Sequence, residues 1–180
     1  MWGVRFLTVF LTMAAWADEP KFNQDVPITS QGKATYYVEG ELEGFGKLRL
    51  LVDTGSGYTA IDETTLAILK EKGSARYLKE LRGVMADGSR RVVPVYLLTS
   101  LNIGGKCEIR DVEAVIFPAD TRPILGLKTL IKVSPFTFSI NPPRLMLSNC
   151  DRINNVPRDG DFPAIGGDKL AKDTESVSAL

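Results

Sequence analysis

Residues 50–57 read LLVDTGSG, so an apolar strand runs directly into one acid, Asp53, and a glycine-containing turn follows it. Backbone amides and neighbouring hydroxyls can donate hydrogen bonds to a carboxylate in such a turn, which fixes its direction. The hydroxyl of Ser56 is one possible donor, and its donation would favour the charged form of Asp53. The alternative is that Ser56 only caps the turn.

The composition restricts the chemistry open to this carboxylate. The 180-residue chain contains no histidine, which excludes Ser-His-Asp and Cys-His catalysis and removes the commonest metal ligand. Its 22 Lys and Arg residues balance 22 Asp and Glu residues, so there is no electrostatic reason to expect a nucleic-acid partner. The length allows one core domain of roughly 100–150 residues with flanking segments.

The first segment, residues 1–17, is typical of a secretory signal peptide. Arg5 precedes an apolar stretch from Phe6 to Trp16, which is too short for the about 20 residues of a membrane-spanning helix. The alternative is an uncleaved membrane anchor. We expect cleavage after Ala17, a periplasmic or secreted product without a stable membrane span, and a polar lead-in over residues 18–33.

The chain has two cysteines, Cys107 and Cys150, and their spacing matches no zinc or iron–sulfur pattern. We therefore expect no metal and no other cofactor. In an oxidising compartment the two cysteines can form one disulfide. Cys107 also alternates with charged residues, which is compatible with a free, buried side chain on a strand. The sequence leaves both possibilities open.

Alternation of apolar and charged side chains predicts a mostly β domain over residues 34–149. Residues 38–52 are expected to form a hairpin around a glycine turn, and its return strand ends at Asp53. Asp62 is a typical N-cap for a helix that ends near Gly73, and this is the clearest helix of the chain.

The rest of the domain is predicted to contain strands and one short helical stretch. A meander covers residues 84–117, and a short strand, a glycine and a helical stretch follow over residues 123–131. The last two strands are expected at 136–140 and 144–147. The segment 150–180 has few large apolar residues and is predicted to be a disordered tail.

Three pieces, in this order, resemble the retroviral-type, single-domain aspartic proteases, also called retropepsin-like proteases, and their exported bacterial relatives. They are LVDTGS at residues 51–56, a glycine hairpin at 86–89 and the apolar piece ILG at 124–126. The resemblance covers residues 34–148. It implies a closed β-barrel, the half-domain of the acid proteases, with one or two short helices.

The resemblance also implies roles for individual residues. Asp53 would be the catalytic acid, supported by Thr54 and Gly55, whereas ILG at 124–126 would support the fold behind them. The hairpin would be a flap over the substrate rather than an ordinary exposed turn, and its tip residues are Ala86, Asp87, Gly88 and Ser89. Candidates for lining the substrate site, each of which could equally belong to the core, are Ile61, Met85, Val92 and Ile124.

Hydrolysis of a peptide without a metal or a covalent nucleophile needs one group to deprotonate water and one to protonate the substrate. Two neighbouring carboxylates that share a proton supply both. The chain has only half of such a site, because Asp87 lacks a preceding apolar strand and Asp120-Thr121 is followed by arginine. A twofold homodimer would bring together two copies of Asp53.

The leading hypothesis is therefore an aspartic endopeptidase that forms a homodimer and cleaves a peptide or protein substrate. Binding by strand addition predicts that the substrate is extended. A second hypothesis is a non-catalytic retropepsin-like module that binds peptides or partner proteins, because half a site is inactive in a monomer. A third is a small structural β domain, for which no dimer is expected.

Overall fold

The computed structural model describes residues 21–32, 34–84 and 88–150. The predicted signal peptide, the tail beyond Cys150, and the flap positions Ala86 and Asp87 lie outside these ranges, as does Met85. The elements are β1 (Gln24–Gln31), β2 (Thr35–Leu42), β3 (Gly46–Val52), β4 (Thr59–Asp62), α1 (Glu63–Glu71), β5 (Ala75–Val84), β6 (Arg90–Ile103), β7 (Cys107–Phe117), β8 (Ile124–Leu125), α2 (Leu127–Lys132), β9 (Phe136–Ile140) and β10 (Pro143–Leu147).

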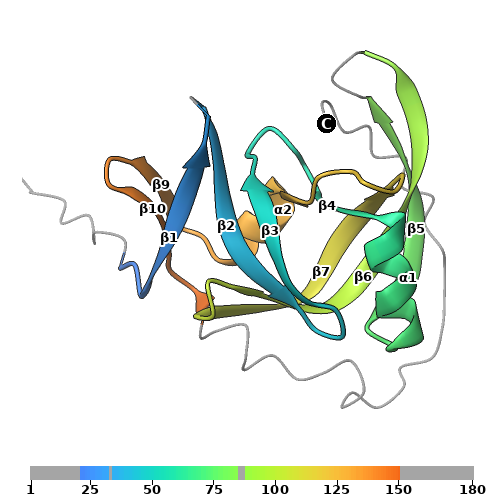
Figure 1. Ribbon diagram of the computed structural model, residues 1–180, viewed down its shortest axis with the longest axis horizontal. Coiled ribbons are helices and arrows are strands. Elements are labelled where there is room, and N and C mark those ends of the chain that lie inside the picture. Colours follow the sequence, from blue (N-terminus) through green and yellow to red (C-terminus); the bar gives the residue numbers. More distant parts are fainter. Residues whose placement is uncertain (1–20, 33, 85–87, 151–180) are drawn as a thin grey trace, which may run out of the picture.

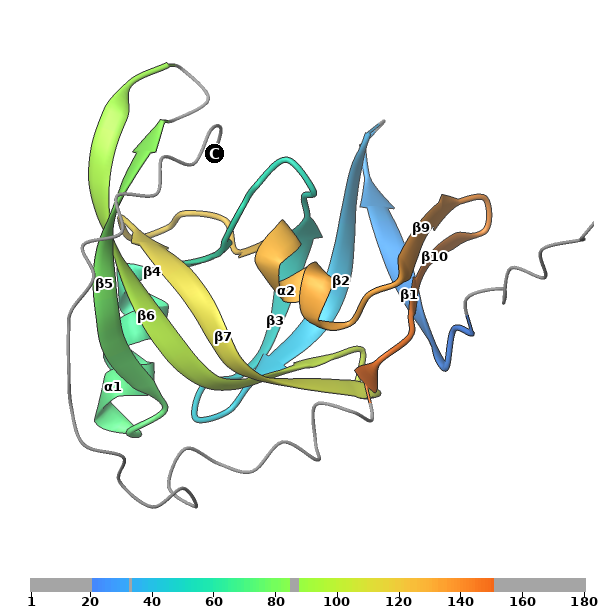
Figure 2. The same ribbon diagram turned by 180° about the vertical axis from the view of Figure 1, so that it is seen from behind.

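The strands of the described residues form one hydrogen-bonded sheet in the order β5-β6-β7-β4-β8-β3-β2-β1-β10-β9 (Figure 1). An additional pairing of β6 with β2 closes the run from β6 to β2 into a barrel. The short helix α2 packs against β7 and β4 (Figure 2). The predicted mostly β fold, a closed barrel with one or two short helices, is confirmed, and the described residues contain two such helices.

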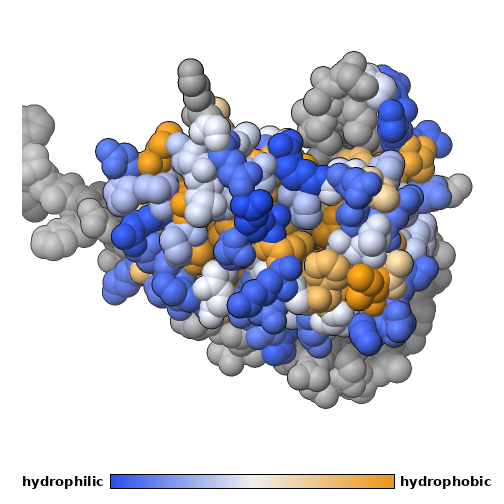
Figure 3. All heavy atoms as spheres, in the orientation of Figure 1, coloured by the Kyte–Doolittle hydropathy of each residue, from blue (hydrophilic) through white to orange (hydrophobic). Residues whose placement is uncertain are grey.

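The β2–β3 hairpin forms as its sequence pattern predicts. Val38 and Leu42 of β2 and Leu50 of β3 point into the core, while the glutamates between them on β2 remain exposed. Gly44 has a positive φ of 88° in the connecting turn, a conformation that glycine adopts without strain. On the outer surface, hydrophilic side chains cover most of the face shown in Figure 3, with small apolar areas between them.

The predicted helix after Asp62 also forms, as α1. The Asp62 carboxylate accepts a hydrogen bond of 2.8 Å from the backbone N–H of Thr65, which is the geometry of an N-cap. Leu66 and Leu69 are buried, so one face of α1 covers the barrel. No helix within the described residues is long and apolar enough to cross a membrane.

The first strand, β1, lies within the segment that we expected to be a polar lead-in before residue 34. It pairs with β10 on one side and with β2 on the other. Val26 and Ile28 are buried while their neighbours are exposed, so the strand has only two apolar residues on its inner face. Such a short alternation does not distinguish a strand from a polar segment, which explains the difference.

The strand β5 is also longer than expected, because the predicted meander began only at residue 84. It pairs along its length with β6, from Ala75 opposite Leu98 to Val84 opposite Arg90. A register shift between Tyr77 and Lys79 interrupts the period of two in the side chains. Because a strand is recognised in a sequence by that period, the first part of β5 has no clear strand pattern.

A disulfide joins Cys107, at the start of β7, to Cys150, which follows β10. Both side chains are buried in the main hydrophobic core. Of the two possibilities that the sequence left open, the structure has the bridge. It closes a loop of 43 residues and connects the last described residue of the domain to the barrel.

Replacing Asp62 by alanine is expected to lower the free energy of unfolding by about 1 kcal/mol, because α1 loses its N-cap. Burial raises the pKa of the Asp62 carboxyl, but hydrogen bonds from Thr65 and from the backbone of Asp120 and of Asp62 itself together outweigh burial and leave the pKa below its ordinary value. The stabilisation that the charged Asp62 carboxylate contributes is fully present above the pKa of an unfolded aspartate, about 3.9. It is lost as the pH falls through the lower pKa of the folded state.

Asp62→Asn is the matched control, because asparagine caps a helix equally well but carries no charge. Urea unfolding between pH 2 and pH 7 measures both variants. The asparagine variant should retain most of the stability at neutral pH and lose the acid-dependent part. Equal stability of the alanine variant and the wild type at pH 7 would contradict the cap.

Candidate active site

The turn after β3 holds the carboxylate of Asp53 in a fixed direction. Asp53 is half-buried, and the backbone N–H of Gly55 donates to its Oδ1 at 2.9 Å. The backbone of the same residue is fixed on both sides: its N–H donates to the carbonyl of Leu125 at 3.2 Å, and its carbonyl accepts from the N–H of Ser56 at 3.3 Å. Thr54 and Gly55 are exposed beside it.

The two-residue strand β8 lies between the strands on either side of this turn. It pairs in parallel with β3, with Leu51 opposite Ile124 and Val52 opposite Leu125, and antiparallel with β4. Beyond β8, the N–H of Leu127 donates to the carbonyl of Ser56 at 2.7 Å. The ILG piece at 124–126 therefore supports the Asp53 turn from behind.

Gly126 is in close contact with the backbone that follows the turn. A Cβ at this position would lie 2.1 Å from the carbonyl oxygen of Tyr58 and 2.7 Å from the amide nitrogen of Thr59. The Gly126 N–H donates to the Thr59 hydroxyl at 3.3 Å, and that hydroxyl lies 2.7 Å from the hydroxyl of Thr129 in α2. Only glycine leaves room for this approach.

The Ser56 hydroxyl does not donate to Asp53. It is buried and donates to the carbonyl oxygen of Tyr58 at 2.8 Å, within its own turn. The hypothesis that it favours the charged form of Asp53 is therefore wrong for this structure, and turn capping is the observed role. The sequence alone does not distinguish the two possible acceptors, the Asp53 carboxylate and the Tyr58 carbonyl, because both lie within a few residues of Ser56.

Tyr58, Lys128 and Glu113 form a polar cluster that the sequence did not suggest. The Lys128 ammonium donates to the Tyr58 hydroxyl at 3.0 Å and to the Glu113 carboxylate at 3.2 Å, and it lies 4.4 Å from the centre of the tyrosine ring. Burial lowers the pKa of Lys128, but these hydrogen bonds, together with the charge interactions with Glu113 and Tyr58, outweigh burial and raise the pKa above its ordinary value. The charged lysine therefore holds α2 to the residue that follows the turn.

The ring of Tyr58 belongs to a second, smaller hydrophobic cluster. Its other buried members are Ala60, Leu81, Val93, Val95 and Val115. Leu81 and Val93 come from β5 and β6, the two strands that form the predicted flap hairpin. The cluster thus connects the Asp53 turn to the base of that hairpin. No signal in the sequence predicts it, because its members come from distant strands.

The predicted substrate-lining residues have different surroundings. Ile61 is only 1% exposed and belongs to the main core, which is the alternative that we considered for it. Ile124 is partly buried against the second cluster, directly behind the Asp53 turn. Val92 is 56% exposed on the hairpin. Of the predicted flap tip, the structure describes Gly88, with a positive φ of 80°, and Ser89.

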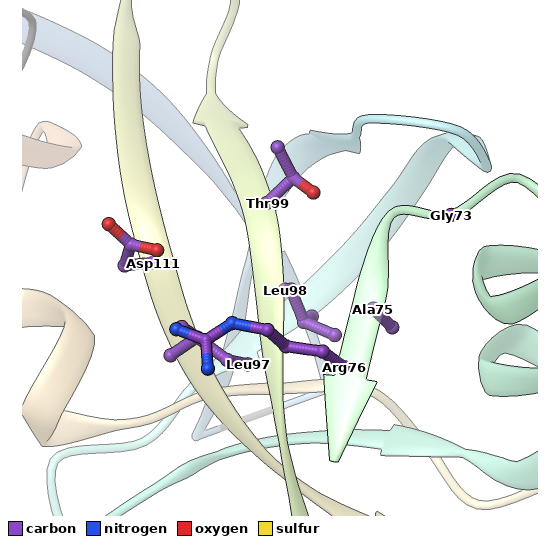
Figure 4. A pocket seen from close by; sticks show the side chains of 7 residues that line it. All are labelled: Gly73, Ala75, Arg76, Leu97, Leu98, Thr99 and Asp111. Atoms are coloured by element: carbon purple, nitrogen blue, oxygen red, sulfur yellow. The ribbon is translucent and has the colours of Figure 1, made fainter. Parts of the chain in front are cut away.

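A small pocket lies elsewhere, where β5, β6 and β7 meet (Figure 4). The pocket has a volume of about 130 Å³, and the side chain of Arg76 extends across β6 toward the strand of Asp111. None of its lining residues belongs to the Asp53 turn or to the predicted substrate site. Within the described ranges, no group of three or more Cys, Asp or Glu side chains is arranged to hold a metal ion.

The sequence pattern of a protein family described as "gag-polyprotein putative aspartyl protease" matches residues 38–132, more than half of the chain. The chain belongs to this family. The matched range begins in β2 and ends with α2, so it contains the Asp53 turn, the β5–β6 hairpin and β8. The resemblance to retropepsin-like proteases that the three sequence pieces indicated is thereby confirmed.

Among solved structures, the fold is similar to the crystal structure of a retropepsin-like aspartic protease from Rickettsia conorii, with a TM-score of 0.51. The two sequences are 16% identical, and the similarity covers 69% of this chain and 90% of the other. At this identity the similarity concerns the fold. No curated protein sequence matches the chain.

Gly126→Ala should destabilise the domain by about 3 kcal/mol or more, because the added methyl group meets rigid backbone. Gly40→Ala is the comparison, since its methyl group would meet the side-chain ends of Leu50 and Leu101, which can move. Thermal or urea unfolding of both variants measures the difference. A smaller loss for Gly126→Ala than for Gly40→Ala would show that the Tyr58 backbone can move away.

Ser56→Ala should cost about 1–2 kcal/mol of stability, because a buried carbonyl loses its donor. The pH dependence of any peptide cleavage should not change, since the hydroxyl is bonded to Tyr58 and not to Asp53. Urea unfolding and a pH–rate profile are the two measurements. A shift of the acid limb of the profile would instead indicate that the Ser56 hydroxyl interacts directly with Asp53.

Proposed function

We propose that the chain is an aspartic endopeptidase that acts as a homodimer, with the catalytic water between the Asp53 carboxylates of two copies. The observation that supports this best is the carboxylate itself, which is half-buried and held by the Gly55 N–H at 2.9 Å. Its neighbours Thr54 and Gly55 are exposed in the single chain, so a second copy can approach the turn. Membership of the aspartic protease family is the second support.

In the proposed mechanism, two carboxylates at close range hold one proton between them, because both cannot be charged without a large repulsion. The charged carboxylate takes a proton from the water, which attacks the carbonyl carbon of the peptide bond. The protonated carboxyl donates to the carbonyl oxygen, and a proton then passes to the leaving amine. The Gly55 N–H, which donates to Oδ1 at 2.9 Å, orients each Asp53 carboxylate toward the water.

The proposed substrate is an extended peptide or exported protein, bound between the Asp53 turn and the β5–β6 hairpin by strand addition. The hydrophobic cluster around Tyr58 supports this arrangement, because it holds the base of the hairpin against the turn. We also propose that the protein acts after export, on the basis of the signal-like residues 1–17. The Cys107–Cys150 disulfide fits an oxidising compartment.

Asp53→Asn is expected to reduce peptide cleavage at least about 10²-fold, because the amide can neither accept a proton from water nor share one. The measurement is cleavage of a peptide library by the purified protein, without residues 1–17, from acid to neutral pH, with solution mass determined in parallel. The matched control is Asp120→Asn, which changes an exposed aspartate of the Asp-Thr-Arg sequence. It should retain full activity.

Dilution provides a further check, since the activity per chain should fall below the concentration at which the dimer dissociates. Peptide cleavage that persists in Asp53→Asn and resists pepstatin would disprove the assignment as an aspartic protease. Absence of cleavage at every pH by an intact protein would favour the non-catalytic binding module. That alternative agrees with the fact that one chain has only half of the catalytic pair.

A further inference from the structure

The register of the β5–β6 hairpin shows which of its side chains face the Asp53 turn. Leu81 lies opposite Val93, and Gly83 lies opposite Arg91, with no register shift between the two pairs. Residues directly opposite each other in an antiparallel pair share a face, and every second residue along a strand returns to that face. Gly83 and Arg91 therefore lie on the same face as Leu81 and Val93.

That face is the inner one. Leu81 and Val93 are 4% and 6% exposed, and both pack in the cluster that contains Tyr58, three residues after Gly55. Arg91 lies two residues beyond Val93 toward the tip of the hairpin, where the two strands extend past the barrel (Figure 1), and it is exposed. Opposite Arg91, Gly83 has no side chain that could compete for the same space.

The charge of Arg91 is not neutralised within the part of the chain that the structure describes. The ion pairs there are Arg110 with Glu108, Lys128 with Glu113, and Arg144 with Asp25. A guanidinium group presents a planar fork of N–H donors that matches a carboxylate in two parallel hydrogen bonds. An arginine on the inner face, close to an extended peptide, is therefore suited to bind an acidic side chain.

We propose that Arg91 is a specificity-determining residue, which binds a Glu or Asp side chain of the substrate, so that the protease prefers acidic peptides. This inference rests on the proposed function. In strand addition, successive substrate side chains point to opposite sides, so Arg91 reads a single position of the peptide. Charged hydrogen bonds of this kind correspond to a preference of about tenfold or more for Glu over Gln at that position.

Arg90 provides a matched control next to Arg91 in the sequence. It has the same charge and is exposed, but strand alternation directs it to the opposite face, together with Val92, which is 56% exposed. Long-range attraction of acidic peptides would depend on both arginines in the same way and would weaken with salt. Direct binding would depend on Arg91 alone.

The experiment compares pairs of peptides that differ only by Glu or Gln at one position, scanned across the cleavage site. For each pair, the ratio of kcat/KM is measured with the wild type, Arg91→Gln, Arg91→Lys and Arg90→Gln at low and moderate salt. The wild type should prefer Glu about tenfold at one position. Arg91→Gln should lower the ratio to about one, Arg91→Lys should retain part of it, and Arg90→Gln should leave it unchanged.

A wild type that cleaves both members of every pair equally would overturn the proposal, as would an equal loss in Arg90→Gln and Arg91→Gln. Binding of the same fluorescent peptides to Asp53→Asn, with and without Arg91→Gln, gives an independent measurement. If no peptide is cleaved but Glu peptides bind better and lose this advantage in Arg91→Gln, the protease assignment fails and Arg91 is still the carboxylate site. Equal binding of Glu and Gln peptides would overturn the Arg91 proposal.

Discussion

The insertion of β8 between β3 and β4 is the constraint on which the rest of the structure depends. It requires Gly126 to approach the backbone of Tyr58 so closely that no side chain fits. Backbone hydrogen bonds from Leu127 and Lys128 to Ser56 and Gly57 then attach the start of α2 to the Asp53 turn. The turn is thus fixed from both sides by main-chain groups, whose positions do not depend on flexible side chains.

This support explains how a short, partly exposed turn can present a carboxylate in one direction. Asp53 receives a hydrogen bond from the Gly55 N–H, while the Ser56 hydroxyl donates to the Tyr58 carbonyl. The ring of Tyr58 continues the connection into the cluster of Leu81 and Val93 at the base of the hairpin. A rigid acid and a hairpin attached to the same cluster are the two parts that the proposed protease needs from each copy, and a second copy would complete the pair of acids.

The sequence predicted best those elements whose stability is local. The β2–β3 hairpin has a clear period of two and a glycine turn, and α1 has its cap at Asp62, and both form as expected. The sequence did not predict β1 or the first part of β5. Strand β1 has only two buried hydrophobic residues, and β5 contains a register shift. These two segments form strands because they pair with β10 and β6, although their own sequence patterns do not indicate a strand.

By itself, the sequence determined the family and the mostly β fold, and it singled out Asp53 as the proposed catalytic acid. Each depends on short stretches of neighbouring residues: an apolar strand, Asp-Thr-Gly and the ILG piece. Only the tertiary structure decided the direction of the Ser56 hydroxyl, the cluster of Tyr58 with Lys128 and Glu113, the disulfide, and the face on which Arg91 lies. The physical reason is that local patterns encode strands and turns, whereas contacts between distant segments depend on the register and closure of the barrel.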